Sequence, residues 1–141
     1  MRITKHLSFV LSVMLPLAMF FPQSVCAQTQ APVDPRTIPV IDGAIGPCTA
    51  DFTVTDSSQA PVYDAKIRVR VAYGFAHAHK LDLEVGTNAA GKARVIGLPD
   101  KTKQGLFFRA SEGKRQGSAF DDPAKTCKAD LTITLEKTSD W

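Results

Sequence analysis

Two histidines at alternate positions, His77 and His79, are the residues of this chain best suited to chemistry. Alternate residues of a β-strand point to the same side, so the two imidazoles could hold Cu(II) or Zn(II) together. A tight zinc site needs three or four ligands, and no further histidine or cysteine adjoins the pair. An exposed pair at a hairpin tip is therefore favoured over the metal site, and no resident cofactor is predicted.

A second candidate is a basic stripe for an acidic ligand. Four basic residues lie on one side of a long alternating segment: Lys66, Arg68, Arg70 and Lys80. Asp82 and Glu84 follow on the returning arm of that segment and would neutralise the stripe, which favours a solvated sheet face. Consecutive Phe107 and Phe108 place one ring outward, and exposed aromatic rings at Tyr63 or Trp141 could anchor a glycan or a protein.

Motifs typical of enzymes are absent from the sequence. It contains no Gly-x-Ser-x-Gly elbow, no His-Glu-x-x-His zinc motif and no glycine loop for phosphate. We therefore predict that the chain is not an enzyme, and a small hydrolase is the least favoured of the functions considered.

Cys48 and Cys127 are predicted to form a disulfide. They are the two cysteines that remain once the first 27 residues are removed, and an exported pair is oxidised in its compartment. The bond would close a loop of about 80 residues, which the chain-entropy model values at ~4.5 kcal/mol. A two-cysteine metal site is the alternative, but no further ligands complete a tetrahedron.

The first 27 residues have the three parts of a secretory signal peptide. Arg2 and Lys5 precede an apolar run, and small residues at Val25 and Ala27 flank a cleavage site. A membrane anchor is disfavoured because the run is shorter than the ~20 residues of a bilayer span, and a lipoprotein signal at Cys26 fits poorly. We predict a secreted or periplasmic protein with no membrane span after cleavage.

The segment 28–47 contains four prolines and is predicted to be an extended tether, within which residues 38–41 could dock as an edge strand. The domain proper is expected over residues 48–141. Of the 17 basic residues, two leave with the signal peptide, which leaves 15 against 14 acidic residues. This near-neutral balance gives no electrostatic basis for binding nucleic acid or an anionic membrane.

Alternating apolar and polar residues predict an all-β fold of about seven short strands in an antiparallel sandwich, transthyretin-like or immunoglobulin-like. Residues 48–55 and 127–134 have nearly the same pattern, each with a cysteine at its head. If these first and last strands lie side by side in parallel, the two cysteines meet without strain. The long alternation over residues 67–85 must reverse, and a turn centred near His77 sets Arg70 opposite Glu84.

Two segments, 52–70 and 87–99, resemble the turn-and-strand motifs of carboxypeptidase regulatory-like domains, and the resemblance extends over roughly residues 50–135. It implies a transthyretin-like sandwich of a kind that is mostly non-catalytic. The hydroxyisourate hydrolases of this fold end in Tyr-Arg-Gly-Ser, which this chain lacks. The resulting hypothesis is an exported, non-enzymatic module that binds another extracytoplasmic protein or a cell-surface component, and the alternative is a periplasmic metal-binding protein using His77 and His79.

Overall fold

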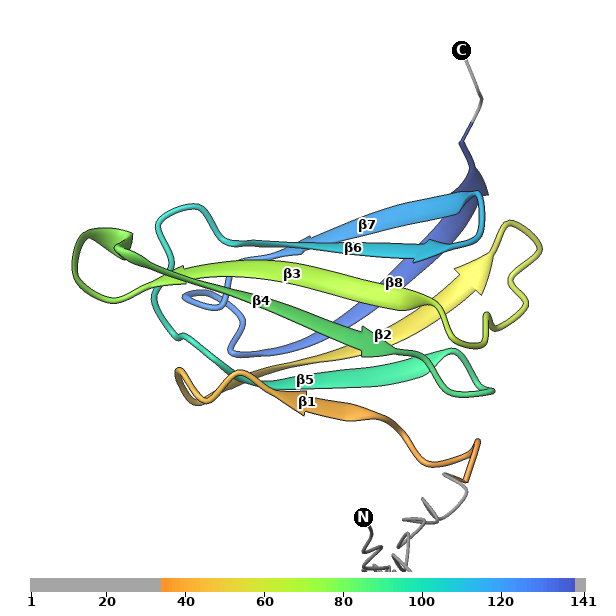
Figure 1. The fold of residues 1–141 in the computed structure, drawn as a ribbon, viewed down its shortest axis with the longest axis horizontal. Helices are drawn as coiled ribbons and strands as arrows, with labels where there is room; N and C mark the ends of the chain where they lie inside the picture. The colour runs from red at the N-terminus through yellow and green to blue at the C-terminus, as the bar shows by residue number, and fades with distance from the viewer. Residues whose placement is uncertain (1–33, 139–141) are drawn as a thin grey trace, which may run out of the picture. The chain divides into compact units, whose positions relative to one another are not determined.

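Eight β-strands and one short 3-10 turn make up the described part of the chain, residues 34–138 of a computed structural model. The first strand, β1, comes from the proline-rich segment, and the others follow at short intervals (Figure 1). The elements are β1 (Val40–Asp42), β2 (Cys48–Asp56), β3 (Lys66–Tyr73), η1 (Phe75–His77), β4 (His79–Gly86), β5 (Lys92–Leu98), β6 (Leu106–Glu112), β7 (Arg115–Asp121) and β8 (Lys128–Lys137). The predicted all-β fold is confirmed.

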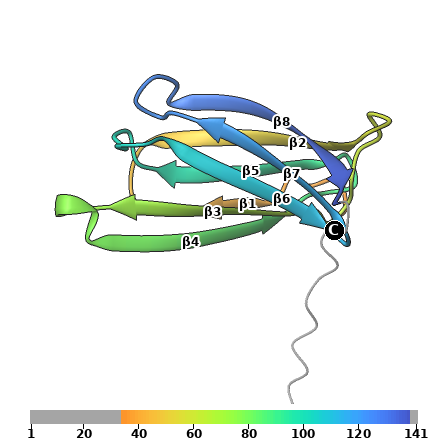
Figure 2. The same ribbon diagram turned by 90° about the horizontal axis from the view of Figure 1, so that it is seen from above.

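Neighbouring strands are hydrogen-bonded in the order β1-β5-β2-β8-β7-β6-β3-β4, and they form two layers. Seen from above, β8, β2 and β5 lie in one layer and β3 and β4 in the other, while β6 and β7 run obliquely (Figure 2). A short antiparallel pairing of Arg115 with Lys137 joins β7 to β8 and so links the layers. Between them the rings of Phe52 and Phe108 meet at 4.8 Å, both fully buried, at the centre of one apolar core.

The two similar segments of the sequence are neighbours in space. Strands β2 and β8 run parallel in register, so Ala50 pairs with Ala129 and Phe52 with Leu131. At the head of this ladder Cys48 is bonded to Cys127, with the two Cα atoms 4.6 Å apart. The predicted disulfide and the parallel contact of these strands are confirmed.

The register predicted for the β3–β4 hairpin is wrong by one residue at its centre. Tyr73 pairs with His79, so the turn is centred on Ala76 rather than His77. Gly74, Ala76 and His77 all have positive φ, and these left-handed residues reverse the chain through the 3-10 turn η1. Because the centre moves by one residue, each strand keeps its buried face, but Arg70 lies opposite Asp82 instead of Glu84.

The predicted signal peptide, residues 1–27, lies outside the described residues, as do residues 28–33 of the tether and Trp141. Over residues 34–138, no helix has the length and apolar character required to cross a bilayer. The carbonyl groups of Arg36 and Thr37 accept hydrogen bonds from the Asn88 side chain, which ties the segment before β1 to the sandwich.

Candidate ligand groove

A groove of about 1270 Å³ opens on the outer face of the β4-β3-β6-β7 layer, and we refer to it as the outer groove. Strand β3 pairs with β6 only from Lys66 to Val69, although β3 continues to Tyr73. Beyond Val69 the two strands are no longer paired. The loop 102–105 and His77 line the groove at this end, while β6 and β7 carry it toward Gln116.

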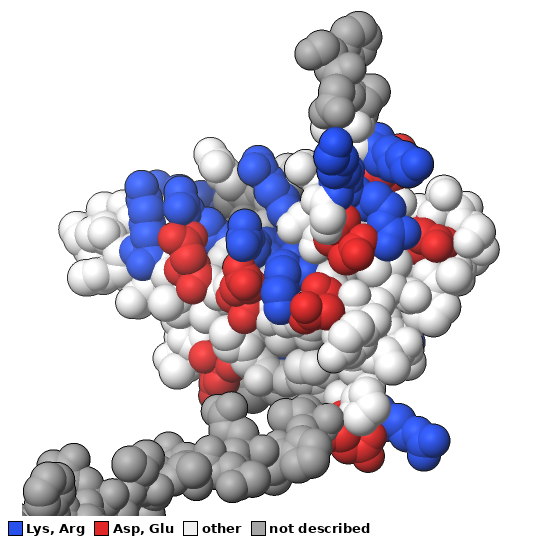
Figure 3. Space-filling model, turned by 45° about the vertical axis from the view of Figure 1, so that its right-hand side comes forward, with Lys and Arg blue, Asp and Glu red and all other residues white. Residues whose placement is uncertain are grey.

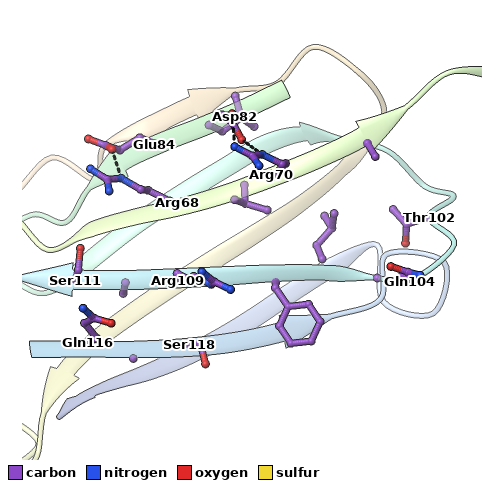
Figure 4. Close-up of a pocket in the computed structure, with 18 of the residues that line it drawn as sticks. Arg68, Arg70, Asp82, Glu84, Thr102, Gln104, Arg109, Ser111, Gln116 and Ser118 are labelled. Carbon is purple, nitrogen blue, oxygen red and sulfur yellow. Dashed lines mark hydrogen bonds and ion pairs between the residues drawn. The ribbon is translucent and has the colours of Figure 1, made fainter. Parts of the chain in front are cut away.

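On the β3 side of the outer groove each arginine is paired with a carboxylate of β4. Arg68 forms an ion pair with Glu84. The Arg70 guanidinium donates two hydrogen bonds to Asp82, of 2.6 and 3.1 Å. These bonds hold the pKa of Asp82 below its usual range and raise the pKa of Arg70. In Figure 4 both arginines turn toward β4 and away from β6.

This pairing bears on the predicted basic stripe. The ammonium group of Lys66 binds the Asp64 carboxylate at 2.7 Å, and that hydrogen bond raises the pKa of Lys66. Three of the four residues of the stripe are therefore paired with carboxylates, as expected for a solvated face. On the face drawn in Figure 3, Lys and Arg side chains form a band with Asp and Glu side chains beneath it.

Arg109 on β6 is different. It is exposed on the outer face, directly opposite Arg68 on β3 and Ser118 on β7. Among residues 34–138 it has no hydrogen-bond or ion-pair partner, and no dashed line reaches it in Figure 4. Like charges directly opposite on neighbouring strands repel one another. The outer groove therefore has an uncompensated guanidinium near its middle.

The balance of charge along the groove supports this. Its lining contains four basic residues, Arg68, Arg70, Lys103 and Arg109, but two acidic ones, Asp82 and Glu84. Since the two carboxylates are engaged by the β3 arginines, the excess positive charge belongs to Arg109 and Lys103.

Neutral hydrogen-bonding groups flank Arg109 within the groove. Ser111 and Gln116 face each other across β6 and β7 in the row next to Arg109 and Ser118. At the other end the buried hydroxyl of Thr102 has no hydrogen-bond partner in the described part of the chain. Figure 4 shows these groups distributed along the groove on both sides of the guanidinium. The groove can thus offer the cations of Arg109 and Lys103 and several neutral polar partners to a ligand.

The prediction for the consecutive phenylalanines is confirmed. Phe108 is fully buried, and Phe107 points outward with 62% of its surface exposed. Phe107 lines the outer groove and packs against Phe120 of β7, with ring centroids 4.9 Å apart. Tyr63 is also exposed, at 64%, but it lies outside this groove.

The histidine pair does not have the geometry assumed from sequence, because His77 belongs to the turn η1 and not to a strand. Its Nδ1 lies 3.4 Å from the carbonyl oxygen of Ala72, while the His79 ring packs against Tyr73 at a centroid distance of 5.4 Å. Over the described residues no cluster of three or more potential metal ligands occurs. Coordination of a metal by His77 and His79 stays a prediction.

Arg109 is the residue that sequence analysis missed. Nothing in its local pattern distinguishes it from other exposed basic residues, since its significance depends on which strand lies beside β6. The nearest signal was the alternation over residues 106–111, which places Arg109 on the same face as Phe107.

The chain was compared with family models, curated proteins and solved structures. No family model matches it, and no curated protein matches it. Similar solved structures include 3-chlorocatechol 1,2-dioxygenase from Rhodococcus opacus 1CP, with 16% identity, a TM-score of 0.46, and coverage of 74% of this chain and 65% of that chain. Catechol 1,2-dioxygenase from Pseudomonas arvilla C-1 has 14% identity, a TM-score of 0.44, and coverage of 77% and 62%.

A third similar structure is a 9R-lipoxygenase from Cyanothece PCC8801, with 13% identity, a TM-score of 0.43, and coverage of 64% of this chain and 17% of that chain. The chain thus spans less than two thirds of each of these proteins. At such low identity, fold does not convey function, and no activity is transferred to this chain.

These neighbours nevertheless correct one prediction. The hypothesis of a non-enzymatic module for a protein or cell-surface component relied on a family whose members are mostly non-catalytic. The structures that resemble this chain include two dioxygenases, so the hypothesis is contradicted and the expectation that the chain is not an enzyme is not confirmed. The resemblance to carboxypeptidase regulatory-like domains stays a prediction.

Proposed function

We propose that this protein binds a small organic anion in the outer groove, with Arg109 as the principal contact. The observation that carries the proposal is the position of Arg109, which lies opposite Arg68 and has no carboxylate partner among residues 34–138. A guanidinium binds a carboxylate or phosphate through two parallel N–H···O bonds, which are stronger than neutral hydrogen bonds.

The shape of the groove supports a ligand larger than an inorganic ion. Polar groups extend along it from Gln116 on β7 to Gln104 in the loop before β6. A bound organic anion could therefore accept hydrogen bonds from the Arg109 guanidinium and form further hydrogen bonds with hydroxyl and amide side chains on either side. Ser118, directly opposite Arg109, is the nearest of these groups by strand register.

The test is an NMR titration of the protein, with acetate, succinate and inorganic phosphate as probes. We expect the side-chain Nε–Hε resonance of Arg109 and the amides of β6 and β7 to shift together. The exposed position keeps the interaction modest, so Arg109→Gln should cost about 1–2 kcal/mol of binding, or about fivefold to thirtyfold in affinity. Arg109→Lys keeps the charge but loses the two parallel N–H donors of the guanidinium, so its affinity should lie between those of wild type and Arg109→Gln.

Arg94→Gln is the matched control. Arg94 is an exposed arginine of β5 on the other layer, where it pairs with Asp51 at 2.5 Å. Its replacement removes the same charge without touching the outer groove. Equal losses from both variants, or shifts spread over both layers, would show non-specific attraction and refute the site.

We further propose that the protein functions in an oxidising, extracytoplasmic compartment. The Cys48–Cys127 disulfide supports this location, because such bonds persist in secreted and periplasmic proteins and are rare in the cytosol. N-terminal sequencing of the exported protein tests the predicted cleavage after Ala27, and a mature chain that begins with Met1 would contradict it.

A further inference from the structure

Next to the outer groove lies an apolar surface that anion binding alone does not use: Phe107, which lines the groove, packs against Phe120, which does not. Phe107 and Phe120 are directly opposite on β6 and β7, and their side chains pack on the solvent side of the layer. Phe107 is 62% exposed and Phe120 is 50% exposed, although each ring covers part of the other. Two large rings left in water at one place form an apolar surface that a ligand can cover.

This aromatic pair lies in the row next to Arg109. Phe107 and Arg109 are two residues apart on β6 and share its outer face, which separates them by about 6.8 Å along the strand. Phe120 and Ser118 have the same relation on β7. The face therefore presents an aromatic row and a cationic row side by side across the same two strands.

A ligand that contacts both rows needs a ring at one end and an anion at the other. A carboxylate attached directly to the ring is short for the distance between the rows, whereas a spacer of two carbon atoms spans it. The long arginine side chain can then meet the carboxylate in its bidentate geometry, and the Ser118 hydroxyl can donate to the same group.

The tilt of the two phenylalanine rings indicates the kind of ring. Their planes meet at 55°, so the two rings do not form one flat surface. An aromatic ring can extend this arrangement with favourable edge-to-face contacts. A saturated sugar ring prefers to lie flat on a broad aromatic face, which a tilted pair offers less well.

We propose that the ligand of the outer groove is an arylalkanoate: an aromatic ring on Phe107 and Phe120, a spacer of about two carbons, and a carboxylate on Arg109. This inference rests on the proposed function, because it specifies the anion that the same groove binds. The ring decides between ligands of equal charge, and the guanidinium decides whether any anion binds.

The experiment compares ligands that differ in one part at a time, by calorimetry or NMR titration of the folded protein. The probes are phenylpropanoate, cyclohexylpropanoate, propanoate, benzoate and glucuronate. We expect phenylpropanoate to bind about tenfold more tightly than propanoate and severalfold more tightly than the other ring compounds. The cyclohexyl compound has the same charge and spacer, so its deficit measures the aromatic contribution.

Variants locate the ring. Phe107→Ala should reduce phenylpropanoate affinity about tenfold and reduce propanoate affinity by much less. Phe107→Leu keeps an apolar side chain in the strand and should lose only the preference for phenyl over cyclohexyl. Phe75→Ala is the matched control, since Phe75 is 95% exposed in the turn η1 and does not line the groove. Circular dichroism of each variant checks that the sandwich is folded.

The outcomes separate this inference from the proposed function. Equal binding of propanoate and phenylpropanoate, or tighter binding of glucuronate, would overturn the arylalkanoate assignment and leave the anion site in place. Phosphate and all carboxylates failing to bind would refute both. Binding of phenylpropanoate that is insensitive to Arg109→Gln but lost in Phe107→Ala would also overturn the assignment, because the carboxylate would then have no place on the cationic row.

Discussion

Removal of the disulfide tests how this fold is held together. The bond joins residues 79 positions apart and therefore closes most of the domain into one loop. In the chain-entropy model, a loop of this length lowers the entropy of the unfolded chain enough to stabilise the native state by ~4.5 kcal/mol. Domains of this size have unfolding free energies of about 5–15 kcal/mol, so the bond accounts for about 30% or more of the total.

The assay is urea unfolding followed by circular dichroism. The double variant Cys48→Ala/Cys127→Ala should lose ~4.5 kcal/mol of unfolding free energy, plus a smaller amount for the sulfur volume removed at the buried Cys48 site. The dependence of the free energy on urea should steepen, because the open chain exposes more surface when it unfolds. Wild-type protein with the bond reduced keeps both sulfur atoms and separates the effect of the cross-link from the effect of the cavity.

A loss below about 1 kcal/mol in the reduced wild type would refute the entropy argument. It would mean that the parallel ladder of β2 and β8 restricts the unfolded chain by itself, through residual pairing of the two similar segments. A large loss without the change in urea dependence would indicate native-state contacts of the cysteines as the cause.

Three further perturbations follow from individual contacts. Gly91→Ala should lower the free energy of unfolding in urea by more than Gly113→Ala. Both glycines have positive φ, where an alanine costs ~1–2 kcal/mol, but a Cβ at Gly91 would also lie 2.3 Å from a β2 carbonyl oxygen, whereas a Cβ at Gly113 meets nothing within 4 Å. Equal losses would contradict the steric argument. Ser58→Ala should raise the pKa of the Asp56 carboxyl, which the Ser58 hydroxyl chiefly lowers, with the amides of Ala60 and Ser58 adding to it. Because folding lowers the pKa of Asp56, its contribution to stability is present above the pKa of the unfolded chain and is lost as the pH falls through the pKa of the folded protein. A carboxyl ¹³C titration measures the pKa of Asp56, and an unchanged pKa in the variant would assign the effect to the amides. Asn88→Ala removes both side-chain bonds to the segment before β1 and should speed amide exchange in β1, while unchanged protection would show that pairing with β5 is sufficient.

Local pattern predicted much of this fold because each strand alternates over its own residues. The two similar segments gave the buried faces of β2 and β8, and their cysteines gave the one long-range constraint, so the parallel contact could be predicted. The β3–β4 register could not, since period-two alternation is unchanged when a hairpin moves its centre by one residue. Only the left-handed backbone at Gly74, Ala76 and His77 fixes the turn, and two of those residues are not glycine.

The outer groove could not be predicted from the sequence because it forms between strands that are distant in the chain. Arg68 and Arg109 face one another only because β6 lies beside β3, a contact that neither segment encodes alone. The sequence pointed to arginines that the structure pairs with carboxylates, and gave no sign of the arginine that it leaves unpaired. Candidate sites on a β-sandwich therefore depend on strand order more than on local motif.

The unpaired arginine should also have a cost in the free protein, which gives a test that needs no ligand. Like charges directly opposite on neighbouring strands destabilise a sheet, and Glu84 offsets part of the charge of Arg68, so Arg109→Gln should raise the free energy of unfolding by about 0.2–0.5 kcal/mol in low salt. The gain should shrink at high ionic strength, where the repulsion from Arg68 is screened. The same variant would then be more stable and bind anions less well, as expected where a residue is kept for binding and not for folding. If Arg109→Gln were less stable than wild type in low salt, Arg109 would have a structural partner, and the case for Arg109 as the contact of a bound anion would fail.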